Sequence, residues 1–291
     1  MRVTPTRRTF RGYAGLNLVG QAYGDPDARS VLLLHGGGQT GYAWGGTAHR
    51  LAEGGWYAMA LDLRGHGDSA WAQDEDYSLD AFAGDVACVV ATFAERPVIV
   101  GASLGGLAAL IAEGEGTGTL SSALVLVDIA PRIELEGMQR IVTFMSAHLD
   151  GFASLAEAAD AIAAYLPHRP RPTDLSRLRK NLRQSPDGRY YWHWDPRFLF
   201  GKRPPSASGD IGRLLRAARN IGVPTLLVRG QLSDMVSEDG VAEFLRAVPN
   251  AHYIDVSDAG HMVVGDRNDI FSNAIVEFLR TLPTPEKEAG A

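Results

Sequence analysis

The stretch Pro97-Val-Ile-Val-Gly-Ala-Ser-Leu-Gly-Gly-Leu107 decides the fold of this chain. Its first part is a short apolar run that is typical of a strand buried on both faces, and Leu104 to Glu113 has the pattern of a helix. Gly101-Ala-Ser103-Leu-Gly105 matches G-x-S-x-G and lies where the strand must turn directly into the helix. A serine in such a turn projects its hydroxyl beyond the end of the strand. We therefore predict that Ser103 is a nucleophile.

Strands and helices alternate on both sides of this stretch. Further buried strands are predicted at residues 31–35, 56–61, 123–128, 224–229 and 252–256, and helices at 44–53, 78–94, 238–247 and 268–282. Near the N-terminus, two alternating strands are expected on either side of a turn at Tyr13 to Gly15. This alternation predicts an α/β fold, with a mostly parallel sheet that is flanked by helices.

One long segment interrupts the alternation. Residues 131–220 contain helical patterns and many prolines and arginines, but no convincing buried strand. We therefore predict a core domain made of residues 1–130 and 221–283, with residues 131–220 inserted as a helical cap, or lid. The polar residues 284–291 are expected to form a disordered tail.

The overall composition excludes several classes of protein. The 291 residues are 45% hydrophobic and 21% charged, with a formal net charge of −6. This charge, without a basic stripe, argues against a nucleic-acid partner, and no apolar run approaches the roughly 20 residues of a membrane span. Cys88 is the single cysteine, which excludes an internal disulfide and a cysteine metal site. We expect a small-molecule substrate and no cofactor or metal, and the sequence leaves the oligomeric state open.

The beginning of the chain resembles an export signal only superficially. Thr6-Arg7-Arg8 could start a twin-arginine signal, but the residues that follow are too polar and too few for its apolar segment. A strand is the better interpretation, and we expect a cytoplasmic protein.

A serine hydroxyl needs a base, and the base needs an acid to orient it. Gly260-His261 follows the last predicted strand, which would place His261 at the same sheet edge as Ser103. Asp234 comes shortly after the strand at 224–229 and is the preferred acid. Asp128, which ends the preceding strand, remains the alternative.

The glycine-rich stretch His35-Gly-Gly-Gly38 ends the first buried strand and suits an oxyanion hole. Glycine lets backbone N–H groups approach a developing negative charge, so we assign the amides of Gly37 and Leu104, with Gly38 as an alternative to Gly37. The substrate is expected to contact aromatic residues: Trp44 after this loop, and Tyr191, Trp192 and Trp194 within the aromatic cluster at 190–200 of the cap.

Together these motifs resemble those of the α/β-hydrolase superfamily. The segment Asp62-Leu-Arg-Gly-His-Gly-Asp-Ser69 is similar to the family's D-x-R-G-x-G-x-S loop, which is structural, so Asp62, His66 and Ser69 are not counted as catalytic. The order Ser103, Asp234, His261 is the family's order of nucleophile, acid and base. Asp128-Ile-Ala-Pro131 also resembles a motif of small esterases in which the acid follows this strand, which keeps Asp128 as a candidate.

The resemblance points to serine-nucleophile branches of the superfamily. Serine at position 103 argues against the epoxide hydrolases and haloalkane dehalogenases, which have aspartate there. The resemblance implies hydrolysis of a small, moderately apolar carboxylic ester or lactone through an acyl-enzyme. The alternatives are a C–C bond hydrolase, against which Gln39-Thr40 stands in place of the usual Pro-Gly, and a perhydrolase or cofactor-free haloperoxidase. A ligand receptor with slow or no turnover is an alternative of another class.

Overall fold

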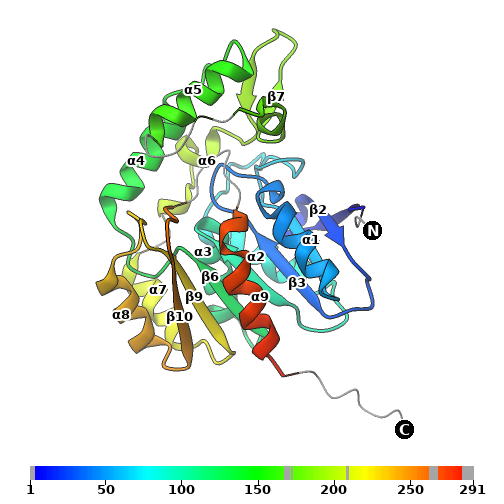
Figure 1. Cartoon of the computed structure of the whole chain (residues 1–291), viewed down its shortest axis with the longest axis vertical. Coiled ribbons are helices and arrows are strands. Elements are labelled where there is room, and N and C mark those ends of the chain that lie inside the picture. The colour runs from blue at the N-terminus through cyan, green and yellow to red at the C-terminus, as the bar shows by residue number, and fades with distance from the viewer. Residues whose placement is uncertain (1–3, 167–170, 172, 208–209, 262–267, 284–291) are drawn as a thin grey trace.

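The computed structural model describes residues 4–166, 171, 173–207, 210–261 and 268–283 (Figure 1). An eight-stranded sheet runs through the molecule in the order β1-β2-β4-β3-β5-β6-β9-β10. Its strands are β1 (Thr6–Arg11), β2 (Asn17–Tyr23), β3 (Ser30–Leu34), β4 (Tyr57–Asp62), β5 (Val98–Ala102), β6 (Ala123–Val127), β9 (Thr225–Gly230) and β10 (Ala251–Val256). β2 pairs antiparallel with β1 and β4, and every other pair in this sheet is parallel. The predicted mostly parallel α/β fold is confirmed.

Helices cover both faces of the sheet (Figure 1). One face packs against α1 (Gly45–Glu53) and α9 (Ser272–Thr281), which follows the short 3₁₀ turn η5 (Asn268–Phe271). The other packs against α2 (Leu79–Val90), α3 (Leu104–Glu115), α7 (Ile211–Arg219) and α8 (Glu238–Ala247). Neighbouring residues of β3 therefore enter different cores: Leu33 lies in the first, whereas Leu32 and Leu34 lie in the second. This burial on both faces explains why β3 and β5 are continuous apolar runs.

The inserted segment stands above the sheet in Figure 1. It contains α4 (Leu135–Ser146), α5 (Leu155–Tyr165), η3 (Leu175–Lys180), β7 (Leu182–Gln184), β8 (Tyr190–Trp192), α6 (Arg197–Phe200) and η4 (Pro205–Ala207). The antiparallel pair β7–β8 was not expected, because each strand has only three residues and no buried apolar run. Another short 3₁₀ turn, η2 (Gly41–Trp44), leads from the end of β3 into α1.

The C-terminal end of the insertion differs from the expected boundary at residue 220. Helix α7 does not lie in the cap but packs on α3 in the core, where Leu214 and Ala217 are buried. Gly114 of α3 faces the Ala217 backbone so closely that a Cβ at position 114 would clash with it. The sequence shows that α7 is amphipathic, but the pattern does not say which surface its apolar side covers.

The segment from Asp62 to Ser69 has the structural role that the resemblance implies. The Asp62 carboxylate accepts hydrogen bonds from the N–H groups of Gly41 (2.7 Å) and Asp68 (2.9 Å). The Ser69 hydroxyl donates to the Asp62 carbonyl and accepts from the Val19 N–H. These bonds hold β2, β4 and the start of η2 together.

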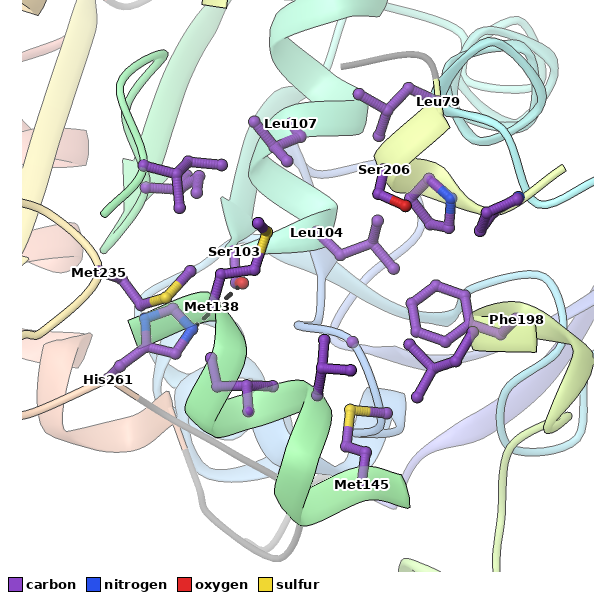
Figure 2. Close-up of a pocket in the computed structure, with 18 residues that line it drawn as sticks. Leu79, Ser103, Leu104, Leu107, Met138, Met145, Phe198, Ser206, Met235 and His261 are labelled. Carbon is purple, nitrogen blue, oxygen red and sulfur yellow. Dashed lines mark hydrogen bonds between the residues drawn. The ribbon is translucent and has the colours of Figure 1, made fainter. Parts of the chain in front are cut away.

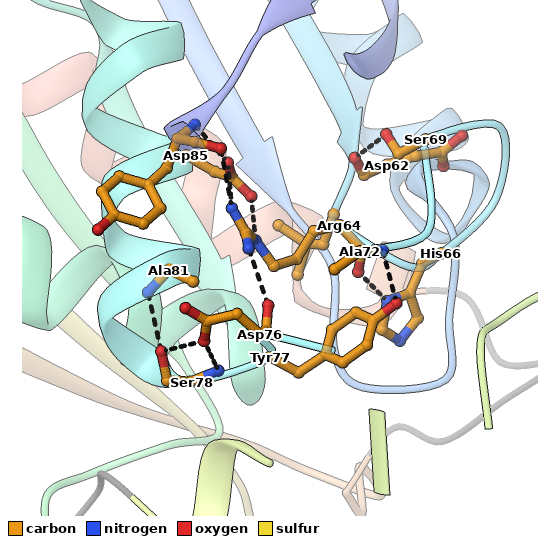
Figure 3. Close-up of polar contacts among 12 residues, drawn as sticks. Asp62, Arg64, His66, Ser69, Ala72, Asp76, Tyr77, Ser78, Ala81 and Asp85 are labelled. Atoms are coloured by element: carbon orange, nitrogen blue, oxygen red, sulfur yellow. Dashed lines mark hydrogen bonds and ion pairs between the residues drawn. The ribbon is translucent and has the colours of Figure 1, made fainter. Parts of the chain in front are cut away.

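A buried ion pair fixes the same region to α2 (Figure 3). Arg64 Nε lies 2.6 Å from Asp85 Oδ2, and both side chains are nearly inaccessible to solvent. Asp85 also accepts from the Tyr13 N–H, which ties down the turn η1 (Tyr13–Gly15) between β1 and β2. Arg64 Nη1 donates to the Asp76 carbonyl, so the guanidinium is bonded on two sides.

The Thr6–Arg11 segment forms β1, which confirms the strand interpretation of the arginine pair. The tail at residues 284–291 lies outside the described residues. None of the described helices is long and apolar enough to cross a membrane.

Candidate active site

Ser103 occupies a sharp turn between β5 and α3. Its φ is +47° and its ψ is −115°, a backbone conformation that side-chain-bearing residues rarely adopt. The turn requires glycine at two neighbouring positions: a Cβ on Gly101 would lie 2.5 Å from the Gly105 carbonyl oxygen, and one on Gly105 would lie 2.7 Å from that of His35. The elbow is therefore built by close backbone packing and exposes the serine hydroxyl at the cap side of the sheet.

His261 reaches this hydroxyl from the loop that follows β10. Its Nε2 lies 3.2 Å from Ser103 Oγ, and the residue is 7% exposed. The loop is held against the end of β9, since the Leu232 N–H donates to the Ala259 carbonyl at 2.8 Å. The structure thus brings together the predicted nucleophile and the predicted base.

Asp128 completes the arrangement. His261 Nδ1 lies 2.6 Å from Asp128 Oδ2, and this carboxylate also accepts hydrogen bonds from the Gly230 N–H (2.9 Å) and the Ser233 hydroxyl (2.8 Å). A histidine that donates from Nδ1 to the carboxylate keeps Nε2 free to accept the Ser103 proton. The side chains form a chain of hydrogen bonds in the order acid, imidazole and hydroxyl.

The preference for Asp234 as the orienting acid is corrected by this geometry. Asp234 pairs instead with Arg140 of α4, with Nη1 2.6 Å from Oδ2. β6 and β9 are neighbours in the sheet, so Asp128 at the end of β6 lies beside the end of β9. The loop after β9 turns Ser233, rather than Asp234, toward that position.

The glycine loop after β3 offers one free amide beside Ser103. Among the described residues, the N–H groups of Gly37 and Leu104 have no hydrogen-bond acceptor, and both residues line the same cavity as Ser103. The Gly38 N–H instead donates to His66 Nε2 at 3.0 Å. Gly38 is therefore not an available oxyanion donor, and this alternative is corrected.

Two buried histidines lie behind the loop. Each donates from Nδ1 to a backbone carbonyl, His35 to Gly36 and His66 to Arg64, and each accepts a backbone N–H at Nε2. Burial lowers the pKa of His66 to about 4 and the pKa of His35 well below the usual range. Both rings are therefore neutral at pH 7 and serve as fixed acceptors.

A cavity of about 250 Å³ opens in front of Ser103 and His261 (Figure 2). Besides these two, Ser206 is the one lining residue with a polar side chain among the described residues, and it lies across the cavity from His261. The other lining residues are apolar: Gly37, Leu79, Leu104, Leu107, Ile129, Ile133, Met138, Ile141, Val142, Met145, Phe198, Leu199, Pro204, Pro205 and Met235. The site is therefore a small, largely uncharged pocket.

The aromatic residues expected at the substrate do not line this cavity. Trp44 is fully buried and donates from its indole to the Leu34 carbonyl at 2.9 Å. Trp192 and Trp194 are buried, and Tyr191 donates to Asp187 instead. None of the four aromatic residues predicted to contact the substrate therefore lies at the cavity in front of Ser103.

Packing against other aromatic side chains explains why the two tryptophans of the cap do not line the cavity. Trp192 packs edge-to-face against Phe152, and Trp194 packs against Phe198. Phe198 comes from the same aromatic cluster and does line the cavity. Within this cluster Trp192 and Trp194 are buried by packing, Phe200 is exposed, and Phe198 is the member that faces the site.

Helix α4 supplies the wall that the sequence analysis missed. Met138, Ile141, Val142 and Met145 recur at helical spacing and face the cavity. That spacing was the available signal, but a lone amphipathic helix does not reveal whether its apolar side packs on a core or lines a pocket. Among the described residues, no cluster of three or more His, Cys, Asp or Glu side chains could hold a metal ion.

Comparison with known proteins identifies the family of this chain. Residues 31–274 match the model of the alpha/beta hydrolase family. The chain belongs to the α/β-hydrolase family. This α/β-hydrolase is 31% identical over 264 residues to esterase Rv0045c of Mycobacterium tuberculosis, which covers 87% of this chain and 82% of the esterase.

Two further comparisons involve a hydrolase of a succinate. The chain is 29% identical to the 2-(acetamidomethylene)succinate hydrolase of Mesorhizobium japonicum, over 76% of this chain and 77% of that enzyme. A solved structure of E-2-(acetamidomethylene)succinate hydrolase superposes with a TM-score of 0.81 and 24% identity, covering 95% of this chain and 100% of that one, which shows a shared fold. This member of the family is an enzyme with relatives named as hydrolases.

Proposed function

We propose that this α/β-hydrolase cleaves small, uncharged carboxylic esters through an acyl-enzyme on Ser103. The observation that carries the proposal is the hydrogen-bonded chain from Asp128 through His261 to Ser103 at the wall of an apolar cavity. The similarity to a named esterase supports the same class of reaction.

The reaction follows from the positions of these groups. His261 Nε2 takes the proton of Ser103 as Oγ attacks the acyl carbon, and the imidazolium is stabilised by Asp128. The amides of Gly37 and Leu104 stabilise the negative charge on the carbonyl oxygen. The C–O bond to the alcohol then breaks, and His261 returns the proton to the departing oxygen.

The second half of the reaction restores the enzyme. A water molecule gives a proton to His261 while its oxygen attacks the acyl carbon. The bond to Ser103 Oγ then breaks, the serine recovers its proton from the imidazolium, and the carboxylic acid leaves. The neutral base is needed in both halves.

The cavity supports a neutral acyl group. No charged side chain lines it among the described residues, so a buried carboxylate would be unpaired there and would bind poorly. Its volume of about 250 Å³ is slightly below the roughly 300–1,000 Å³ of pockets for drug-sized ligands. The substrate named for the Mesorhizobium japonicum hydrolase is a succinate, which carries carboxylates. The described lining of this cavity contains no Lys or Arg that could pair with a carboxylate.

The test uses a fluorophosphonate probe and a series of p-nitrophenyl esters. We expect the probe to label Ser103, and short neutral acyl esters to be hydrolysed by the wild type but not by Ser103→Ala. Ester hydrolysis that persists in Ser103→Ala, or binding of esters without turnover by the wild type, would overturn the proposal. The second outcome would favour a receptor.

A further inference from the structure

The three amides of the glycine loop have different partners. The Gly36 N–H donates to Gln39 Oε1 at 2.9 Å, and the Gly38 N–H donates to His66 Nε2 at 3.0 Å. The Gly37 N–H, between them, has no acceptor in the part of the chain that the structure describes. Two side-chain acceptors therefore hold the amides on either side of the one that remains available.

His66 is a rigid acceptor. The ring is fully buried, and its Nδ1 donates to the Arg64 carbonyl at 2.8 Å (Figure 3). Since Nδ1 carries the proton, Nε2 has a lone pair to accept from Gly38. The ring also packs edge-to-face against His35 and Phe198, with centroids 5.2 and 5.0 Å away. It has little freedom to turn away from the loop.

Phe198 packs between His66 and Gly37, so His66 also contacts Gly37 indirectly through this ring. A Cβ on Gly37 would lie 3.3 Å from Phe198 Cζ, so this ring lies directly against the Gly37 backbone. His66 thus fixes Gly37 through the adjacent Gly38 amide and through the ring that packs on both. Phe198 also lines the cavity in front of Ser103 (Figure 2).

Gln39 holds the other side of the loop. Its Oε1 accepts the Gly36 N–H, and its Nε2 donates to Asn268 Oδ1 at 3.3 Å, with both residues fully buried. Asn268 follows His261 by only seven residues. Gln39 therefore connects the glycine loop with the start of η5.

We propose that His66 and Gln39 are positioning residues that present the Gly37 N–H to the oxyanion. This inference rests on the proposed serine hydrolase. Neither side chain touches the substrate: each acts through a backbone hydrogen bond to a glycine beside Gly37. Gln39 is one of the two residues that stand in place of the Pro-Gly usual in C–C hydrolases, and its hydrogen bonds give it this role.

The first test separates His66→Leu from His66→Gln. Leucine removes the acceptor, so kcat for a p-nitrophenyl ester should fall about 10- to 100-fold while KM changes little, because the lost interaction acts on the transition state. Glutamine carries an acceptor oxygen at a similar reach and should restore most of kcat. The affinity for a trifluoromethyl ketone, which forms a tetrahedral oxyanion on the serine, should weaken in parallel with kcat/KM.

The second test uses Gln39→Leu and the double variant Gln39→Leu/His66→Leu. Both side chains position the same amide, the Gly37 N–H. The kcat of the double variant should therefore be no more than about threefold below that of the poorer single variant. Leu51→Ala in α1 is the control for general destabilisation, since Leu51 is buried in the core on the α1 and α9 face of the sheet. It should lower Tm and leave kcat unchanged below the transition.

Several results would overturn the inference. The inference fails if His66→Leu keeps the kcat and the ketone affinity of the wild type. It also fails if His66→Leu and His66→Gln lose kcat equally and in proportion to their loss of Tm. If the leucine variant does not fold, ¹⁵N spectra of the wild type decide the matter: a proton on Nε2 of His66, or rapid exchange of the Gly38 amide, contradicts it. Failure of the proposed function is distinguishable, because the wild type itself would then bind esters without turnover, or Ser103→Ala would keep the activity.

Discussion

Nδ1 of His261 lies 2.6 Å from Oδ2 of Asp128, although 133 residues separate them in the chain. Asp128 has a φ of +51°, which turns its side chain away from β6 toward the end of β9. There the Gly230 N–H and the Ser233 hydroxyl donate to the same carboxylate. The imidazole is thus oriented by a buried acid that is itself held in place.

Substitution of the two candidate acids should separate them clearly. Asp128→Asn replaces the acceptor that selects the histidine tautomer, so we expect kcat to fall by about 10³- to 10⁴-fold. Asp234→Asn loses only a half-exposed pair with Arg140 and should change kcat less than about threefold. Steady-state kinetics with one ester checks both. The assignment fails if Asp234→Asn is the more damaging change.

The sequence predicted the sheet and the position of Ser103 because their signals are local. A buried strand next to G-x-S-x-G specifies its own turn, and each core strand was placed within one or two residues. The choice between Asp128 and Asp234 depends on how one loop folds after β9, where Ser233 and Asp234 are adjacent and only one of them faces inward. No periodicity encodes that direction.

The pocket was harder to predict for a related reason. Trp44 and Trp192 are large aromatic residues near the expected site, but large apolar side chains are buried wherever space allows. The wall actually comes from α4, through residues such as Met138 and Met145. Which side of a cap helix faces the core domain depends on the docking of the whole cap.

A new charge in the cavity wall should change substrate preference. Val142 is 39% exposed on α4, so Val142→Arg can place a guanidinium at the cavity without burying it completely. The wild type should prefer the p-nitrophenyl ester of butyrate over that of hemisuccinate by about 100-fold or more, because an unpaired carboxylate is costly to bury. Val142→Arg should reduce this ratio at least tenfold. Val142→Gln is the control for size, and an unchanged ratio in Val142→Arg would contradict the apolar pocket.

The buried pair Arg64–Asp85 should matter for stability rather than for chemistry. Asp85→Asn leaves the Arg64 charge buried without its carboxylate, and we expect a loss of about 3–5 kcal/mol in the free energy of unfolding. Glu277→Ala removes an exposed partner of Arg280 and should change this free energy by less than about 1 kcal/mol. Urea unfolding measures both. Equal effects would mean that the buried pair adds nothing beyond a surface pair.

The buried ring of His66 predicts how stability depends on pH. Burial lowers its pKa to about 4 in the folded protein, from 6.5 for an ordinary histidine. Between these values the unfolded chain binds a proton that the folded chain does not, so folding stability from this group is fully present above pH 6.5 and is lost as pH falls toward 4. From pH 8 to pH 5 the free energy of unfolding of the wild type should therefore fall by about 2 kcal/mol more than that of His66→Gln.

Neighbouring Asp195 and His193 are present in both proteins, so their contributions largely cancel in the difference. Urea unfolding at the two pH values gives this difference, and His252→Gln, which removes an exposed imidazole, is the matched control. If the curves of the wild type and His66→Gln run parallel, His66 is not the neutral acceptor that the Gly38 amide requires.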